Sequence, residues 1–249
     1  MPRFCASLDI RDAGGDNCRV DAASPSRRRK KPRTKAGRSR AETWRLKKLL
    51  LLEQSFWERG LEYVAGVDEA GRGPLAGPVF AAAVIMPRGV TIRGVDDSKQ
   101  LTAEKRERLL GEIFTKALCV GVAGASNREI DRINILRATH LAMLRAVRKL
   151  RLPPQHIIVD GLPVPLLGSD QTAVVDGDAK VHCVACASIV AKVMRDKLMK
   201  MLSSRYPAYG WEHNVGYATA DHRSAINIVG LTPHHRRSFT EDDQLLLEL

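Results

Sequence analysis

The most constraining feature of the sequence is a succession of short apolar runs separated by segments with helical periodicity. Each run has the length and composition of a largely buried strand. The runs lie at 63–67, 79–86, 90–95, 118–125, 156–160 and 172–178. The run at 90–95 is expected to pair with 79–86 through the turn at 87–89. Because strands that alternate with helices build layered sheets with some parallel pairing, the pattern predicts an α/β fold.

The segments between the strands carry helix-start signals. Thr102 is suited to cap a helix over 102–116, and Ser126 with Glu129 has the spacing of a capping box. The other helices are predicted at 41–59, at 126–150 and at 183–203. The segment after residue 205 is polar and irregular, which favours a small helical appendage. No internal repeat is present.

Positive charge is concentrated near the N-terminus. The chain of 249 residues has a formal net charge of +12, and residues 1–60 hold 16 Lys and Arg against 7 Asp and Glu. Such an excess favours a polyanionic partner, nucleic acid above all, although a solvated tail that only aids solubility has the same composition. We expect a disordered basic tail at 1–40, a helix or linker at 41–60, a catalytic core at 61–205 and a helical extension at 206–249.

The number and spacing of the cysteines indicate in which cellular compartment the protein folds. The five cysteines are Cys5, Cys18, Cys119, Cys183 and Cys186. An odd and scattered set argues against a disulfide framework and fits a reducing cytoplasm. The chain also lacks an apolar stretch long enough for a secretory signal or a membrane span. We therefore expect a cytoplasmic protein that does not associate with a membrane. Cys183 and Cys186 are interpreted as buried small residues, since a lone Cys-x-x-Cys is weak evidence for zinc or redox chemistry.

Three of the predicted strands end in carboxylates. Asp68 and Glu69 follow the first run, Asp160 closes the fifth and Asp178 closes the sixth. A single acid at a strand end is usually a turn former or a helix cap. Several acids that meet at one sheet edge repel one another unless a cation is present, and Mg²⁺ or Mn²⁺ prefers carboxylate and water oxygens. The acids therefore predict a metal site, and two such ions could hydrolyse a phosphodiester.

One geometric difficulty concerns the adjacent pair. Neighbouring residues on a regular strand point to opposite faces, so Asp68 and Glu69 could share a site only if the strand twists. Gly71 and Gly73 follow directly and could supply the backbone freedom for a bend.

The order of motifs along the chain resembles ribonuclease HII, over about residues 61–239. The segments that carry the resemblance are GVDEAGRGPLAGPV, DDSKQLT, INILRATHLAM, VDG, GDAKV, CASIVAKVMRD, GYATADH and HHRRSF. Eight segments in the same order are hard to obtain by chance. The chain departs from the family in having Asp176 where Lys is usual, and in the pair Cys183 and Cys186.

The resemblance implies a ribonuclease H-like fold, with a mixed five-stranded sheet flanked by helices and a C-terminal helical extension. It implies an endoribonuclease that uses Mn²⁺ or Mg²⁺, hydrolyses the RNA strand of RNA–DNA hybrids and nicks 5′ of ribonucleotides embedded in duplex DNA. The products implied are 3′-hydroxyl and 5′-phosphate ends, and we expect a monomer. The catalytic acids implied are Asp68, Glu69, Asp160 and Asp178.

The resemblance also implies the substrate contacts. The residues concerned are Gly71, Arg72, Gly73, Ser98, Lys99, Lys192 and Tyr217. The Gly-Arg-Gly stretch is expected to contact the 2′-hydroxyl, the group that separates RNA from DNA. Tyr217 is expected to stack on the neighbouring sugar, and Ser98 with Lys99 to hold a phosphate.

Two further assignments remain open from the sequence. Asp196 lies four residues after Lys192 on one helix stripe that begins at Ser188, so it could be an outer metal ligand or simply an ion-pair partner of Lys192. The basic residues at 234–237 are interpreted as a rim that faces phosphates rather than as a metal site.

Two rival functions remain from other classes. A non-catalytic nucleic-acid-binding protein would use the basic tail and would not need acids at strand ends. A metal-dependent phosphatase would act on small phosphate esters. A dinucleotide loop does not fit AGRGPLAG, because Pro74 lies where the helix should open, and a nucleotide-triphosphate loop would need Gly-Lys-Ser/Thr.

Overall fold

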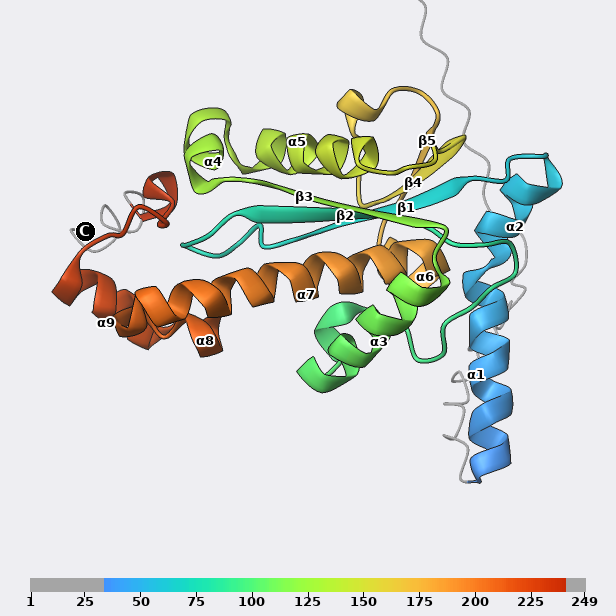
Figure 1. Ribbon diagram of the computed structural model, residues 1–249, viewed down its shortest axis with the longest axis horizontal. Helices are drawn as coiled ribbons and strands as arrows, with labels where there is room; N and C mark the ends of the chain where they lie inside the picture. The colour runs from blue at the N-terminus through green and yellow to red at the C-terminus, as the bar shows by residue number, and fades with distance from the viewer. Residues whose placement is uncertain (1–33, 241–249) are drawn as a thin grey trace, which may run out of the picture.

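The computed structural model describes residues 34–240 and places a five-stranded mixed sheet at the centre of the molecule (Figure 1). The strands are β1 Val64–Ala70, β2 Val79–Ile85, β3 Cys119–Ala125, β4 His156–Asp160 and β5 Gln171–Val174. Their order is β3-β2-β1-β4-β5. Strands β1 to β3 pair antiparallel, whereas β4 pairs parallel with both β1 and β5. The predicted α/β fold with a mixed five-stranded sheet is confirmed.

Helices cover both faces of the sheet, with α4 and α5 on one side and α3 and α7 on the other (Figure 1). The longer helices are α1 Lys35–Leu49, α2 Leu51–Glu58, α3 Ala103–Lys116, α5 Ile135–Arg148, α7 His182–Arg205 and α9 Ala220–Val229. The shorter ones are α4 Asn127–Ile133, α6 Gly177–Lys180 and α8 Trp211–Asn214, with 3₁₀ turns at Ser98–Gln100, Pro165–Leu167 and Pro207–Tyr209. Thr102 caps α3, and Ser126 with Glu129 forms the predicted capping box of α4.

Two glycines explain how closely the layers approach. A Cβ atom on Gly66 of β1 would overlap the backbone of Cys183 in α7, and one on Gly121 of β3 would overlap the carbonyl oxygen of Ala146 in α5. Small residues in the strands therefore let both long helices lie directly on the sheet. This packing fixes the position of α7 along β1.

The prediction of a strand at 90–95 is wrong. This segment is a loop in which the N–H of Val90 bonds to the carbonyl of Pro87 and the N–H of Ile92 donates to the imidazole of His182. Strand β2 has β1 on one edge and β3 on the other, so neither edge is free to receive a further strand. The apolar side chains of Ile92 and Val95 are buried instead beneath this loop.

The run at 172–178 is also interrupted. Strand β5 ends at Val174, Asp176 takes a left-handed conformation with φ 55°, and Asp178 lies in the short helix α6. Asp178 is therefore held by a helical turn, not by a strand end. The prediction that the acids follow strand ends is confirmed for Asp160, the last residue of β4. Asp68 and Glu69 lie near the end of β1, just before its last residue, Ala70.

The N-terminal segment is a packed part of the molecule. The helix predicted at 41–59 begins at Lys35, inside the range expected to be disordered, and is divided at Leu50 into α1 and α2. Phe56 and Trp57 of α2 pack in one apolar cluster with Val64 of β1 and Val184 of α7. Residues 1–33 and 241–249 lie outside the described residues. Within residues 34–240 no helix is long and apolar enough to cross a membrane.

Candidate active site

A cavity of about 290 Å³ opens where β1 runs on past the end of its pairing with β4. Its lining residues are Asp68, Glu69, Ala70, Gly71, Arg72, Gly73, Ser98, Lys99, Asp160, Ser188, Lys192 and Tyr217. The structure thus brings together nearly all of the predicted site residues from β1, β4, α7 and three loops. The predicted residues outside the lining are Asp178 and Asp196.

The adjacent acids Asp68 and Glu69 both line this cavity. The pairing with β2 stays in register from Ala65 through Ala70, which includes Asp68 and Glu69. The parallel pairing with β4 ends at Val67 and Val159. Beyond that point one edge of β1 is open. The backbone bends directly after the strand, at Arg72 and Gly73, and Gly71 has φ +93°, so the bend expected at these glycines is present.

Asp68 is the most enclosed of the acids, with 4% of its surface exposed. Burial raises its pKa well above the usual value, and the charges of Glu69 and Asp160 raise it further. Its Oδ1 accepts a hydrogen bond of 2.6 Å from the N–H of Glu69, and the nearby hydroxyl of Ser188 in α7 opposes the rise in pKa. Burial likewise raises the pKa of Glu69, against the opposing charge of Arg72, whose Nη1 lies 3.4 Å from Glu69 Oε1.

The other two acids meet at the end of β4. Oδ1 of Asp160 accepts a 2.6 Å hydrogen bond from the N–H of Gly177, which ties β4 to α6. The next residue, Asp178, lies beside the cavity, and its pKa is raised to about 6 by burial and by the charges of Asp160 and Asp97. Burial is the largest cause of the raised pKa values of Asp68, Glu69 and Asp178, and the neighbouring carboxylates add to it.

Lysine side chains face these acids. Burial would lower the pKa of Lys99, but the charges of Asp97, Asp178 and Asp68 outweigh this and raise it. Ser98 is buried, and its Oγ accepts a 3.0 Å hydrogen bond from Ser188. Ser188 therefore lies close to both the loop at 98–99 and Asp68, a position that the sequence signalled only through the stripe on α7.

The stripe on α7 divides into two parts. Lys192 lines the cavity, and its Nζ lies 5.9 Å from the ring centroid of Tyr217. Asp196 does not line it: one carboxylate oxygen lies 2.8 Å from Lys192 Nζ and the other 3.8 Å from Arg106. The structure thus shows the ion-pair alternative, and the assignment of Asp196 as a metal ligand does not match this placement.

The Gly-Arg-Gly loop is held from behind by Arg236. Its guanidinium donates to the carbonyls of Gly71 at 2.6 Å, Arg72 at 2.7 Å and Gly77 at 2.9 Å. Arg236 is fully buried, and burial together with the charge of Arg195 lowers its pKa to about 9. At neutral pH it remains a cation with three charge-assisted hydrogen bonds to one loop.

Arg195 of α7 completes this support. It donates to the carbonyls of Ala76, Pro78 and Val215. Gly71 has φ +93°, and a Cβ atom there would overlap the Arg195 side chain, so only glycine fits this position. The prediction of a phosphate-facing rim at 234–237 is wrong for His235 and Arg236, which are internal.

Helix α7 also receives a cap from the N-terminal segment. Its own N-cap residue, Val181, has no side-chain hydrogen bond. The carboxyl of Glu53 from α2 is buried at this helix end, where Oε2 accepts from the N–H of Cys183 at 3.4 Å, and burial raises its pKa to about 8. Cys183 and Cys186 are buried free thiols, in line with their interpretation as small packing residues.

The donor set fits a hard divalent cation. Four carboxylates from β1, β4 and α6 gather around one cavity, and three of them have raised pKa values because they are buried close to like charges. Mg²⁺ needs only one or two carboxylates and keeps several waters. Within residues 34–240, no three His, Cys, Asp or Glu side chains form a ready-made metal-binding cluster.

Comparison with known proteins decides the family. A family model described as Ribonuclease HII matches residues 65–242. The chain belongs to the ribonuclease HII family. Ribonuclease HII of Thermosynechococcus vestitus is 50% identical over 192 residues, which cover 76% of this chain and 89% of that protein. Ribonuclease HII of Geobacillus kaustophilus is 46% identical over 214 residues, covering 86% and 82%.

Solved structures agree with the family and the fold. The crystal structure of ribonuclease H2 from Pyrococcus horikoshii OT3 superposes with a TM-score of 0.60 at 28% identity, over 75% of this chain and 99% of that one. The resemblance seen in the sequence motifs is therefore confirmed. Membership in the ribonuclease HII family identifies the chain as a ribonuclease and implies hydrolysis of RNA paired with DNA.

Proposed function

We propose that this ribonuclease HII family member is a two-metal endonuclease that cuts the RNA strand of RNA–DNA hybrids and nicks 5′ of single ribonucleotides in duplex DNA. The products are a 3′-hydroxyl and a 5′-phosphate. The observation that carries the proposal is the convergence of Asp68, Glu69 and Asp160 in one cavity, with Asp178 beside it; burial and the neighbouring acids raise the pKa values of Asp68 and Asp178.

The four carboxylates would hold Mg²⁺ or Mn²⁺, which supplies an activated water and stabilises the leaving oxygen. The N–H of Glu69 holds the side chain of Asp68 in place by a hydrogen bond, and the N–H of Gly177 holds that of Asp160. Both acids therefore keep a fixed orientation before substrate arrives. Lys99 and Lys192 stand at the rim of the same cavity and provide positive charge for the scissile and neighbouring phosphates.

Selection for RNA rests on the Gly-Arg-Gly loop. The 2′-hydroxyl is the group that distinguishes the two sugars, and a backbone without side chains can approach it closely. Arg236 fixes the loop by binding the carbonyls of Gly71 and Arg72, so the loop presents its other backbone groups in one conformation. Tyr217 is 43% exposed across the cavity from Gly73, where its ring can stack on the adjacent sugar.

The test uses a labelled DNA duplex with one embedded ribonucleotide, incubated with Mg²⁺, with Mn²⁺ or with a chelator. We expect a single nick 5′ of the ribonucleotide with either ion, and no nick with chelator. Asp160→Asn should abolish the nick but preserve binding. Asp176→Asn is the matched control, because Asp176 is 73% exposed at its side chain and pairs only with Lys180 among the described residues.

The rival functions give different results in the same assay. A binding protein without catalysis would bind the duplex and leave it intact under every condition. A phosphatase would hydrolyse a chromogenic phosphate ester and leave the duplex intact. Retention of the nick in Asp160→Asn would refute the assignment of the carboxylates.

A further inference from the structure

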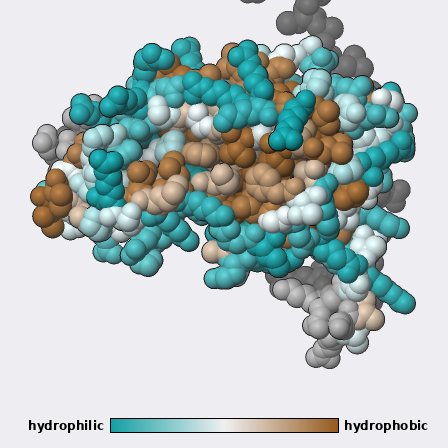
Figure 2. All heavy atoms as spheres, viewed as in Figure 1, coloured by the Kyte–Doolittle hydropathy of each residue, from teal (hydrophilic) through white to brown (hydrophobic). Residues whose placement is uncertain are grey.

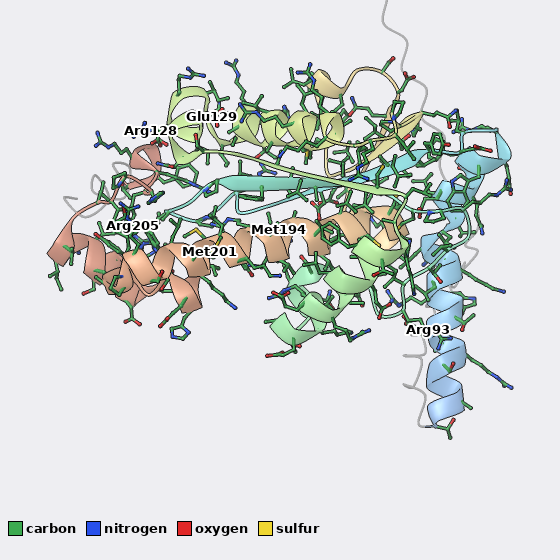
Figure 3. All side chains as sticks on the ribbon, viewed as in Figure 1. Arg93, Arg128, Glu129, Met194, Met201 and Arg205 are labelled. Carbon is green, nitrogen blue, oxygen red and sulfur yellow. The ribbon has the colours of Figure 1, made fainter. Side chains whose placement is uncertain are left out.

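Four exposed arginines lie around two adjoining hollows at the end of the molecule where α4 meets the C-terminal segment (Figure 1). We call them the arginine patch. They are Arg128 and Arg132 of α4, Arg137 of α5 and Arg237. The hollows measure about 630 and 480 Å³, and Asp131 lines both. Figure 3 shows Arg128 directed away from the body of the molecule at this end.

The positive charge of the arginine patch is not compensated within the described residues. None of its four guanidinium groups forms an ion pair with a residue in 34–240. The nearby acids have other partners. Asp131 accepts from the N–H groups of Arg237 and Ser238 and from the hydroxyl of Ser238, while Glu129 lies 2.7 Å from Arg145. The surface over α4 and α5 is accordingly hydrophilic in Figure 2.

Hydrogen bonds hold the two sides of the arginine patch together. Nδ2 of Asn127, in the first turn of α4, donates to the carbonyls of Pro233 at 2.7 Å and His235 at 3.1 Å. Asp131, one turn later, caps the segment that starts at Arg237. The arginines of α4 and the one at position 237 therefore stand on one rigid surface, as a binding site for a regular polymer requires.

Two contacts link the arginine patch to the Gly-Arg-Gly loop, which lines the cavity. Arg236, the neighbour of Arg237, holds the carbonyls of Gly71 and Arg72. On the other side, His140 lies one turn after Arg137 on α5, and both its burial and the charge of Arg72 lower its pKa. Two independent connections thus join the patch to the Gly-Arg-Gly side of the cavity.

We propose that the arginine patch binds backbone phosphates of the duplex that flanks the cleaved position, outside the catalytic cavity. The inference rests on the proposed function, because the cavity itself accommodates only the nucleotides beside the cut. Arginine suits this task because its planar group binds phosphate oxygens with two parallel hydrogen bonds. Rigid, unpaired arginines on two adjoining hollows match the repeated charge of a nucleic-acid backbone.

The test compares two double variants that remove the same charge. Arg132→Gln/Arg137→Gln alters the patch, and Arg148→Gln/Arg151→Gln alters exposed arginines at the other end of α5. Binding is measured in chelator by fluorescence anisotropy, on ribonucleotide-containing duplexes of about 10 and about 30 base pairs, at several salt concentrations. Thermal unfolding of each variant verifies that it is folded.

For the long duplex, we expect the patch variant to bind about tenfold more weakly and its salt slope to fall by about 1.8, since each lost phosphate contact removes about 0.9. The short duplex and the control variant should show little change. Arg128→Gln/Arg237→Gln should reproduce the loss from the other hollow, which covers the case in which the first variant fails to fold.

Equal affinity of the patch variant and the control at every salt concentration would overturn the inference, and would leave an acidic protein segment as the better partner for this surface. An equal loss on both duplex lengths would overturn it too, because the effect would then lie in the cavity. Failure of the unaltered protein to nick is a separate result. It would refute the proposed function, whereas the binding comparison would still show whether the arginine patch contacts the duplex.

Discussion

Replacing Asp178 with Asn should stabilise the metal-free protein at the same time as it impairs catalysis. In the folded state the pKa of Asp178 rises from 3.8 to about 6, because the carboxyl is buried near Asp160 and Asp97. A shift of about 2 units corresponds to about 3 kcal/mol. Since solvent reaches part of this group, screening reduces the expected gain to about 1–2 kcal/mol.

The sign follows from proton linkage. The folded protein holds the proton on Asp178 more tightly than the unfolded chain, so ionisation costs stability only in the folded state. The penalty is absent below about pH 4, grows as the pH rises towards 6 and is complete above that. The free energy of unfolding of the unaltered protein should therefore fall across this window, and that of Asp178→Asn should fall less.

The measurement is urea unfolding in chelator at several pH values from 4 to 8, with Asp176→Asn as control. The control removes an exposed acid two residues away, and its stability should stay within about 0.5 kcal/mol of the unaltered protein. Added Mg²⁺ should stabilise the unaltered protein in proportion to the logarithm of its concentration, and Asp178→Asn less.

The reasoning fails if Asp178→Asn in chelator at pH 8 is no more stable than the unaltered protein. Such a result would mean that burial and the charges of Asp160 and Asp97 do not penalise the ionised carboxyl of Asp178 in the folded state. The electrostatic case for a cation at this cavity would then be lost, whatever the variant does to activity.

The remaining predictions concern the loop behind the cavity. Gly71→Ala should cost about 2–4 kcal/mol and abolish cleavage, because its φ is +93° and the new Cβ overlaps Arg195; Gly73→Ala, whose Cβ meets only Tyr217 at 4.0 Å, should keep the stability. Arg236→Met should cost about 3–5 kcal/mol in thermal unfolding, since three buried carbonyls lose their donor. Exposed Arg237→Met is its control, and equal melting temperatures of the two would contradict the role of Arg236.

Much of the fold could be predicted because local signals agreed with the final packing. The run at 118–125 and the caps at Thr102 and Ser126 define their elements by periodicity and hydrogen bonding within a few residues. The run at 90–95 has the same composition as a strand, but whether it joins the sheet depends on the free edges of its neighbour. That information lies in the pairing of strands far apart in the chain.

The acids at the cavity could be predicted from their residue type and their place after apolar runs, whereas the residues that support the cavity could not. Arg236 lies in a locally hydrophilic stretch, and its three acceptors are more than 150 positions away in the sequence. Backbone carbonyls carry no sequence signal, so nothing marks Arg236 as internal. The role of Asp196 could not be predicted either, because a carboxylate suits an ion pair and a metal site equally well.

The carboxyl that Glu53 places over the first turn of α7 has a practical consequence for anyone who shortens this protein. The family match starts at residue 65, which invites a recombinant fragment cut at that boundary. Such a fragment would lose Glu53, Phe56 and Trp57, and would leave the amide groups and apolar side chains around Cys183 open to water. The family model leaves the trimmed region out, yet the helix that carries Ser188 and Lys192 would begin without its cover.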